Sequence, residues 1–258
     1  MDLGIKGKTA LITGGSKGIG LMIAETMAEE GCNLVLVSRT AKDLEEAKAK
    51  LLAKHKIRVD VLAMDLSVGD NTRKLADTFP DIDILINNAG AIRQGNLEEV
   101  TDALWRSYWD LKVFGYINLT RAYYARMAAR KRGVIINIIG VAGERLRSTY
   151  IAGSTGNASL IAFTRALGSE SSEHNVRVVG INPGPVLTEK LMLSLRKSAQ
   201  NKYNDPERWQ EFIKDMPFGR PIHPYEISSM AALLASDLQG YTSGTVITID
   251  GGGPKASR

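Results

Sequence analysis

Cysteine is nearly absent from the 258 residues: the only one is Cys32, so the chain cannot form an internal disulfide. A chain without disulfides fits a reducing compartment, and we expect a cytoplasmic protein. Cys32 precedes an apolar run, where a small buried side chain is expected, and no histidine stands beside it in sequence to activate a thiolate. We therefore interpret Cys32 as core filler, with a reactive thiol as the alternative.

Histidines and long apolar runs are also scarce. His55, His174 and His223 are too scattered to have the spacing of a metal site, so we expect no metal. No apolar run reaches the length of a membrane span, and charges near the N-terminus argue against a signal peptide. The formal net charge is +5, but no stripe of basic and aromatic residues indicates nucleic-acid binding.

Strand-like runs alternate with amphipathic helical patterns, and no Pro/Ser-rich linker, low-complexity tract or repeat interrupts them. We expect strands near residues 10–12, 33–37, 59–63, 82–86, 133–139, 177–181 and 245–249. We expect helices at 41–54, 68–78, 101–130 and 154–170. This alternation predicts one α/β domain over residues 1–258, with a doubly wound parallel sheet covered by helices on both faces.

The most informative motif lies between residues 8 and 20. An apolar strand at 10–12 is followed by spaced glycines and then by a helical face on which Ile19 and Ile23 recur. Missing Cβ atoms admit a pyrophosphate, and the helix N-terminus offers unpaired N–H groups. The sequence therefore predicts a bound dinucleotide, which a basic protein also suits, with a purely structural turn as the alternative.

The spacing Thr-Gly-x-x-x-Gly-x-Gly resembles the cofactor loop of the short-chain dehydrogenase/reductase family, and the resemblance extends over roughly residues 7 to 252. The Asn-Asn-Ala-Gly run after the fourth strand and the Pro-Gly turn after the sixth are similar to cofactor-contacting segments of that family. The resemblance implies a Rossmann-type oxidoreductase. It assigns cofactor binding to Gly14, Ser16, Lys17, Gly18, Ile19, Gly20, Arg39, Thr40, Asp65, Leu66, Asn87, Asn88, Ala89, Gly90, Pro183, Gly184, Val186 and Thr188.

Two cations bear on the choice between the nicotinamide dinucleotides. In dinucleotide-binding folds an acidic residue after the second strand holds the adenosine ribose hydroxyls, whereas an arginine suits a 2′-phosphate. Here Arg39 follows the second strand and Lys17 lies inside the glycine loop. We therefore expect NADP(H) rather than NAD(H), with a solvated surface arginine as the alternative.

The side chains with which this family moves protons are replaced. The resemblance places Gly153 at the family's Tyr position, Asn157 at its Lys position and Gly140 at its Ser position. Lys112 falls where the family has Asn on the preceding long helix, so the Lys and the Asn look exchanged. Tyr150 stands three residues before Gly153, which is less than one helical turn.

We expect Lys112 and Asn157 to lie near the cofactor ribose and Tyr150 to donate a proton, in an oxidoreductase acting on a carbonyl or alcohol substrate. The alternatives are structural: Tyr150 as the first residue of a helix, and Lys112 as a carbonyl partner or an exposed cation. The main functional alternative is an NADP(H)-binding protein that senses redox state or supports a partner subunit. A cofactor-independent lyase or isomerase is a third.

The segment 190–223 has little strand pattern, and the family resemblance assigns it to a substrate lid. Its apolar content suggests a bulky or apolar small-molecule substrate. Its basic residues suit an anionic group or a solvated helix face: Arg196, Lys197, Lys202 and Arg208. The family resemblance also implies a homodimer or homotetramer through the helices near 101–130 and 154–170, although a core role explains the same residues.

Overall fold

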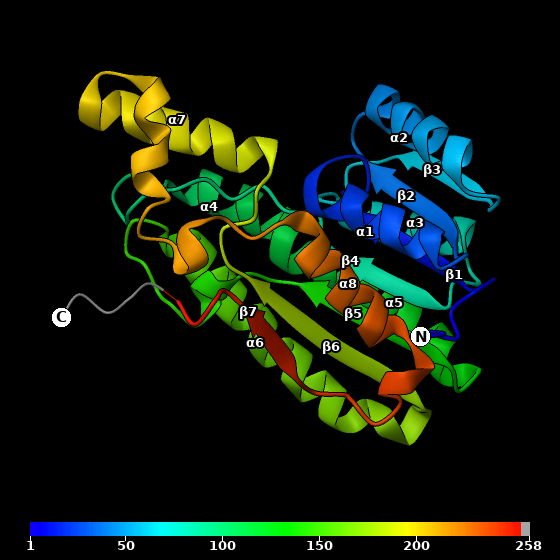
Figure 1. Ribbon diagram of the computed structural model, residues 1–258. Coiled ribbons are helices and arrows are strands. Elements are labelled where there is room, and N and C mark those ends of the chain that lie inside the picture. Colours follow the sequence, from blue (N-terminus) through cyan, green and yellow to red (C-terminus); the bar gives the residue numbers. More distant parts are fainter. Residues whose placement is uncertain (254–258) are drawn as a thin grey trace.

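A parallel sheet of seven strands forms the centre of the computed structural model, which describes residues 1–253 (Figure 1). The strands are β1 (Thr9–Thr13), β2 (Asn33–Ser38), β3 (Val59–Ala63), β4 (Ile84–Asn87), β5 (Gly133–Ile138), β6 (Val176–Pro183) and β7 (Val246–Ile249). Their order is β3-β2-β1-β4-β5-β6-β7, and each neighbouring pair is parallel. The chain reverses its direction across the sheet between β1 and β4, where a crevice opens at the carboxyl ends.

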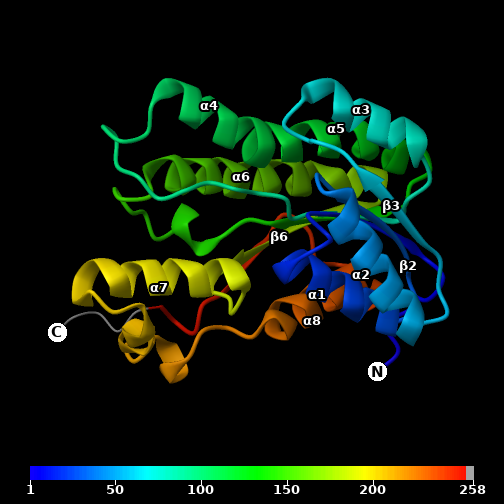
Figure 2. The same cartoon turned by 90° about the horizontal axis from the view of Figure 1, so that it is seen from above.

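Helices cover both faces of this sheet, as Figure 2 shows. They are α1 (Gly18–Glu29), α2 (Ala41–Lys54), α3 (Gly69–Thr78), α4 (Asp102–Trp109), α5 (Gly115–Ala129), α6 (Ile151–Glu170), α7 (Glu189–Tyr203) and α8 (Pro224–Ala235). Apolar faces of α1, α2 and α8 form one buried layer, and those of α3 and α5 form the other. The predicted single-domain, doubly wound α/β fold is confirmed.

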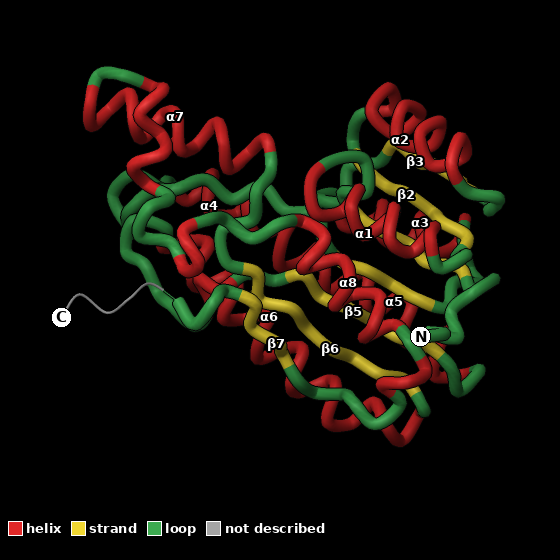
Figure 3. The backbone as a smooth tube through the Cα atoms, viewed as in Figure 1, coloured by secondary structure: helices red, strands yellow, loops and turns green. Residues whose placement is uncertain are grey.

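The central strands are buried on both faces, which explains their continuous apolar runs. Figure 3 shows that the loops leaving β4, β5 and β6 gather on the side of the sheet where α7 stands. Among the described residues, no helix is both long and apolar enough to cross a membrane.

The segment predicted as a helix at 101–130 is helical from Asp102 to Ala129, but an unpredicted π-helical turn at Asp110–Phe114 divides it into α4 and α5. A π-helical turn contains one residue more than an α-helical turn, and such turns inside α-helices are frequent at functional sites. Lys112 is the middle residue of this turn. No apolar pattern in the sequence distinguishes it from ordinary helix.

The helix predicted at 154–170 begins earlier, at Ile151, so Gly153 and Gly156 both lie within α6. Each glycine inside a helix costs about 1 kcal/mol relative to alanine. In the structure, Tyr150 packs over Gly153 and Trp109 packs beside Gly156. These tertiary contacts use the bare backbone and outweigh the local propensity.

Candidate active site

A cavity of about 740 Å³ lies at the carboxyl ends of the strands. Its walls come from the start of α1, from the loops after β4, β5 and β6, and from α6 and α7. In open α/β sheets, ligands bind in this crevice, next to the point where the strand order reverses. The cavity is therefore the candidate site.

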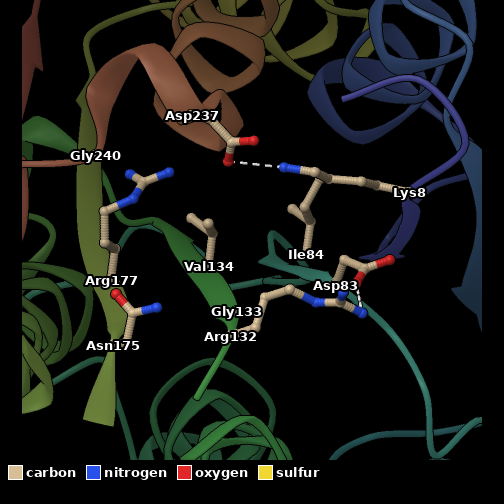
Figure 4. A pocket seen from close by; sticks show the side chains of 10 residues that line it. All are labelled: Lys8, Asp83, Ile84, Arg132, Gly133, Val134, Asn175, Arg177, Asp237 and Gly240. Atoms are coloured by element: carbon tan, nitrogen blue, oxygen red, sulfur yellow. Dashed lines mark hydrogen bonds and ion pairs between the residues drawn. The ribbon is translucent and has the colours of Figure 1, made fainter. Parts of the chain in front are cut away.

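A smaller cavity of about 190 Å³ lies at the opposite, amino ends of the strands (Figure 4). Its charged groups are paired with one another: Lys8 lies 2.8 Å from Asp237, and Arg132 lies 3.0 Å from Asp83. The Arg177 guanidinium donates to two backbone carbonyl oxygens. These pairs make the small cavity a structural feature.

Glycines shape a phosphate cradle at the start of α1. Gly14 and Gly18 have φ values of +64° and +57°, which favour glycine. A Cβ on Gly20 would lie 2.2 Å from the Gly14 carbonyl oxygen, so a larger residue does not fit there. Among the described residues no side chain caps the first N–H groups of α1, which leaves them available to an anion. The segment fits a dinucleotide pyrophosphate.

The Asn-Asn-Ala-Gly segment is hydrogen-bonded to the residue that begins this loop. The backbone N–H groups of Asn88 and Ala89 donate to Thr13 Oγ1 at 2.9 and 3.0 Å. Asn87 has a different role: its side chain is buried, and its Nδ2 donates to Asn137 Oδ1 at 2.9 Å. Asn87 thus joins β4 to β5, whereas Asn88 lines the cavity.

The other residues predicted to bind the cofactor fall into two groups, one in the cavity wall and one in the neighbouring loops. Those that line the cavity are Ile19, Gly90, Pro183, Gly184, Val186 and Thr188. Others form the turns next to it: Ser16, Thr40, Asp65 and Leu66. In this second group, Asp65 Oδ1 accepts hydrogen bonds from the N–H and the hydroxyl of Ser67, which lower the pKa of Asp65. Leu66 is packed into the core.

The two cations expected at the adenosine phosphate are not equivalent. Lys17 Nζ lies 2.9 Å from Asp43 Oδ2, and this hydrogen bond raises the pKa of Lys17. Arg39 is exposed, and among residues 1–253 it forms no ion pair within 4.0 Å. The predicted pair of cations is therefore accompanied by a carboxylate, which reduces the positive charge offered to a 2′-phosphate.

Tyr150 lies directly over the backbone of Gly153. A Cβ on Gly153 would be 2.1 Å from both Cε1 and Cζ of the Tyr150 ring, so the ring occupies the space of a side chain at position 153. Tyr150 lines the cavity and also precedes α6 as its N-cap residue. Burial raises the pKa of Tyr150, so its hydroxyl stays protonated at neutral pH.

Lys112 is only 7% exposed and lines the cavity from the π-turn. Its Nζ donates to the Ile138 carbonyl oxygen at 2.7 Å and to Tyr116 Oη at 2.8 Å. Its stem packs against Gly90, where a Cβ would lie 2.8 Å from Lys112 Cδ. Burial, with a smaller effect from the charge of Lys190, lowers the pKa of Lys112 to about 7. Lys112 can therefore exchange a proton near neutral pH.

Asn157 lies on α6 and lines the same cavity with 4% exposure. A Cβ on Gly140 would lie 2.9 Å from Asn157 Nδ2, so the amide fills the space that Gly140 leaves. Gly140 itself has a φ of +137°, a conformation that strains other residues. The structure thus brings Lys112, Tyr150 and Asn157 to one cavity.

Sequence reasoning missed three charged residues that line this cavity: Arg93, Arg147 and Lys190. Each lies shortly after the carboxyl end of a strand, where ligands bind in this fold. That position was the available signal. The described residues contain no group of three or more potential metal ligands.

Known proteins resemble this chain over nearly its whole length. The family model described as short chain dehydrogenase matches residues 8–199. The chain is 34% identical to oxidoreductase UcpA of Escherichia coli K12, over 96% of the chain and 95% of that protein. It is 31% identical to galactitol 2-dehydrogenase (L-tagatose-forming) of Cereibacter sphaeroides, over the same shares. The structure of L-sorbose reductase from Gluconobacter frateurii, complexed with NADPH and L-sorbose, has a TM-score of 0.90 at 32% identity and covers 97% of this chain and 98% of that one.

Proposed function

We propose that this chain, which belongs to the short-chain dehydrogenase/reductase family, is an NADP(H)-dependent oxidoreductase that reduces the carbonyl group of a small organic substrate. One observation carries the proposal: the cavity that the dinucleotide segments line is also lined by Lys112, Tyr150 and Asn157. Two of the relatives, a galactitol 2-dehydrogenase and an L-sorbose reductase, are named for carbonyl and alcohol chemistry, which is consistent with the proposal.

In this proposal Tyr150 gives the proton to the substrate oxygen. When bound, NADPH supplies the hydride, which the protein itself cannot provide. Burial keeps the Tyr150 phenol protonated, and an alkoxide formed from the substrate is a stronger base than a phenolate, so transfer to it is favourable. The raised pKa of Tyr150 opposes its use as a base, which is why we favour carbonyl reduction over alcohol oxidation.

Lys112 and Asn157, which stand at the family's Asn and Lys positions respectively, support this step. The Lys112 amine, held by the Ile138 carbonyl oxygen and Tyr116, exchanges protons near neutral pH and so replenishes the proton that the site loses. The Asn157 amide has no hydrogen-bond partner among residues 1–253, so its donor and acceptor are available to a ribose hydroxyl.

The choice of NADP(H) over NAD(H) rests on Arg39 and Lys17. An exposed arginine after β2 is placed to bind a 2′-phosphate with charge-assisted hydrogen bonds. Lys17 can exchange Asp43 for that phosphate, because their ion pair lies at an exposed position and is weak. The segment 190–223, which includes α7, remains our proposed substrate lid.

Removal of the Tyr150 hydroxyl tests this function. We expect Tyr150→Phe to lower kcat for NADPH-dependent carbonyl reduction by roughly 10²-fold or more, because a positioned proton donor contributes about that much. The Kd for NADPH, measured by fluorescence titration, should stay unchanged. Tyr124→Phe is the matched control, since that hydroxyl bonds His174 outside the cavity. A Tyr150→Phe variant as active as the parent would remove Tyr150 from the mechanism.

A further inference from the structure

The candidate cavity is charged with one sign. The lining residues include no Asp or Glu, in the part of the chain that the structure describes. They include five basic residues: Arg93, Lys112, Arg147, Lys190 and Lys197. A cavity with this lining has a positive potential, which low-dielectric walls strengthen.

The cations on the substrate side are not neutralised by other protein groups. Within residues 1–253, Arg93, Arg147 and Lys197 form none of the ion pairs within 4.0 Å. Two arginines close to them in sequence do form ion pairs. Arg145 Nη2 lies 2.6 Å from Asp250 Oδ2, and Arg196 Nε lies 3.8 Å from Glu207 Oε1. The chain therefore pairs the charges beside the cavity and leaves those on its wall without carboxylate partners.

The nearby acidic residues are directed to other partners. Glu144 accepts a hydrogen bond from Thr248 at 2.8 Å and lies 3.6 Å from Arg165. Glu189 precedes Lys190 in sequence, but its charge acts on Lys17 at the glycine loop. Neither carboxylate lines the cavity.

Arg147 is held in place by a buried hydroxyl. Its N–H donates to Ser154 Oγ at 3.0 Å, and Ser154 Oγ donates back to its carbonyl oxygen at 3.3 Å. Ser154 is 3% exposed and belongs to α6, so the loop after β5 is attached to a rigid element. The backbone from which the exposed Arg147 side chain extends is therefore fixed at the cavity wall.

Bound cofactor does not account for these charges. Its phosphates belong at the glycine loop and the start of α1, where the cradle is built. Arg93, Arg147 and Lys197 come instead from the loop after β4, from the loop after β5 and from α7. None of these three residues is among those predicted to bind the cofactor, so we assign their part of the cavity to the substrate.

We propose that the substrate carries an anionic group, a carboxylate or a phosphate, which Arg93, Arg147 and Lys197 bind. This inference rests on the proposed function, because it names the substrate class of that same site. Apolar residues of the cavity, such as Ile92 and Leu191, contact the carbon skeleton. Arginine forms planar two-point hydrogen bonds with carboxylate and phosphate, and it is the residue best suited to this recognition.

Matched ligands that differ only in charge test the inference. The protein, saturated with NADP⁺, is titrated by calorimetry with levulinate and its methyl ester, and with dihydroxyacetone phosphate and dihydroxyacetone. In at least one of the two pairs, we expect the anion to bind about tenfold more tightly than the neutral compound, because charge-assisted hydrogen bonds contribute at least that factor. Which pair shows the difference identifies carboxylate or phosphate. If neither anion binds more tightly than its neutral partner, the inference is overturned.

Variants locate the effect. Arg147→Gln and Lys197→Gln should each remove most of the preference for the anion while leaving the Kd for NADPH unchanged. Arg196→Gln is the matched control, since Arg196 is on the same helix as Lys197 but outside the cavity wall. A preference that survives both cavity substitutions would contradict the assignment. Failure to bind NADP⁺ at the saturation step would instead contradict the proposed function.

Discussion

Glycine residues leave the space that the candidate catalytic side chains occupy. The Tyr150 ring lies where a side chain of Gly153 would be, and the Asn157 amide lies where a side chain of Gly140 would be. These side chains and glycines are therefore coupled by packing: the space opened by one residue is filled by the other. The absence of side chains at Gly153 and Gly140 is, on this account, part of the site.

The close packing of the Tyr150 ring on Gly153 predicts how a methyl group added at position 153 changes activity. Gly153→Ala should raise intrinsic helix stability by about 1 kcal/mol but force the Tyr150 ring to move. We expect kcat to fall by about tenfold or more, because the proton donor is displaced. Gly69→Ala, with nothing within 4 Å of the added Cβ, is the control. Equal kcat in parent and variant would show that the ring position is unimportant.

The buried Lys112 predicts how stability changes with pH. Its pKa is about 7 in the folded protein and 10.5, the ordinary lysine value, in the unfolded chain, so between these two pH values the unfolded chain binds the additional proton. Stability contributed by this residue therefore rises as the pH increases from 7 toward 10.5, by up to about 1.4 kcal/mol per pH unit.

Urea unfolding of the parent and of Lys112→Met at about pH 7 and about pH 9 measures this contribution. The parent should gain stability relative to the variant at the higher pH. The same substitution should lower turnover at least about tenfold, since it removes the amine from the cavity. Identical pH dependence in the two proteins would mean that the folded-state pKa of Lys112 is not lowered.

In our proposal, the preference for NADPH over NADH depends on the charges of Lys17, Arg39 and Asp43. Asp43→Asn should free Lys17 and tighten NADPH binding by roughly threefold to tenfold without changing NADH binding, because only NADPH has the 2′-phosphate. Arg39→Gln should weaken NADPH binding by a similar factor. Fluorescence titrations with both dinucleotides measure the effects. Equal changes for NADH and NADPH would assign these charges to another role.

The family resemblance at Gly153 and the spacing of three residues, which is less than one helical turn, together predicted Tyr150 near the site. The ion pair of Lys17 with Asp43 could not be predicted in this way. It is a contact between the glycine loop and α2, and no local pattern indicates it. Likewise, Arg147 lies in a loop without periodicity, so only its position after β5 could have placed it at the cavity.

At the level of elements, bounds were predicted best where one apolar or amphipathic pattern covers the whole element. β3 and α2 have the predicted bounds, because an apolar run or an amphipathic stripe defines each of them. The strand expected at 82–86 begins later, at Ile84, where pairing with β1 starts. The π-turn and the early start of α6 depend on tertiary packing around Lys112 and Gly153, which local patterns do not contain.

At the scale of the whole molecule, the fold brings the carboxyl ends of β1, β4, β5 and β6 to one crevice. That arrangement combines an uncapped helix N-terminus, a cavity with a positive lining and the three candidate side chains Lys112, Tyr150 and Asn157. Family membership and fold agree with the sequence prediction throughout residues 8–199. The assigned reaction requires all three parts to act on one substrate.

Transfer of deuterium from labelled NADPH tests this account most directly. The protein is incubated with a panel of carbonyl compounds and with NADPH that carries deuterium at the transferable position of the nicotinamide ring, and products are analysed by mass spectrometry. We predict an alcohol that has gained one deuterium with the parent protein and almost none with Tyr150→Phe. Tight NADPH binding with no deuterated alcohol from any carbonyl compound would contradict the proposed reaction.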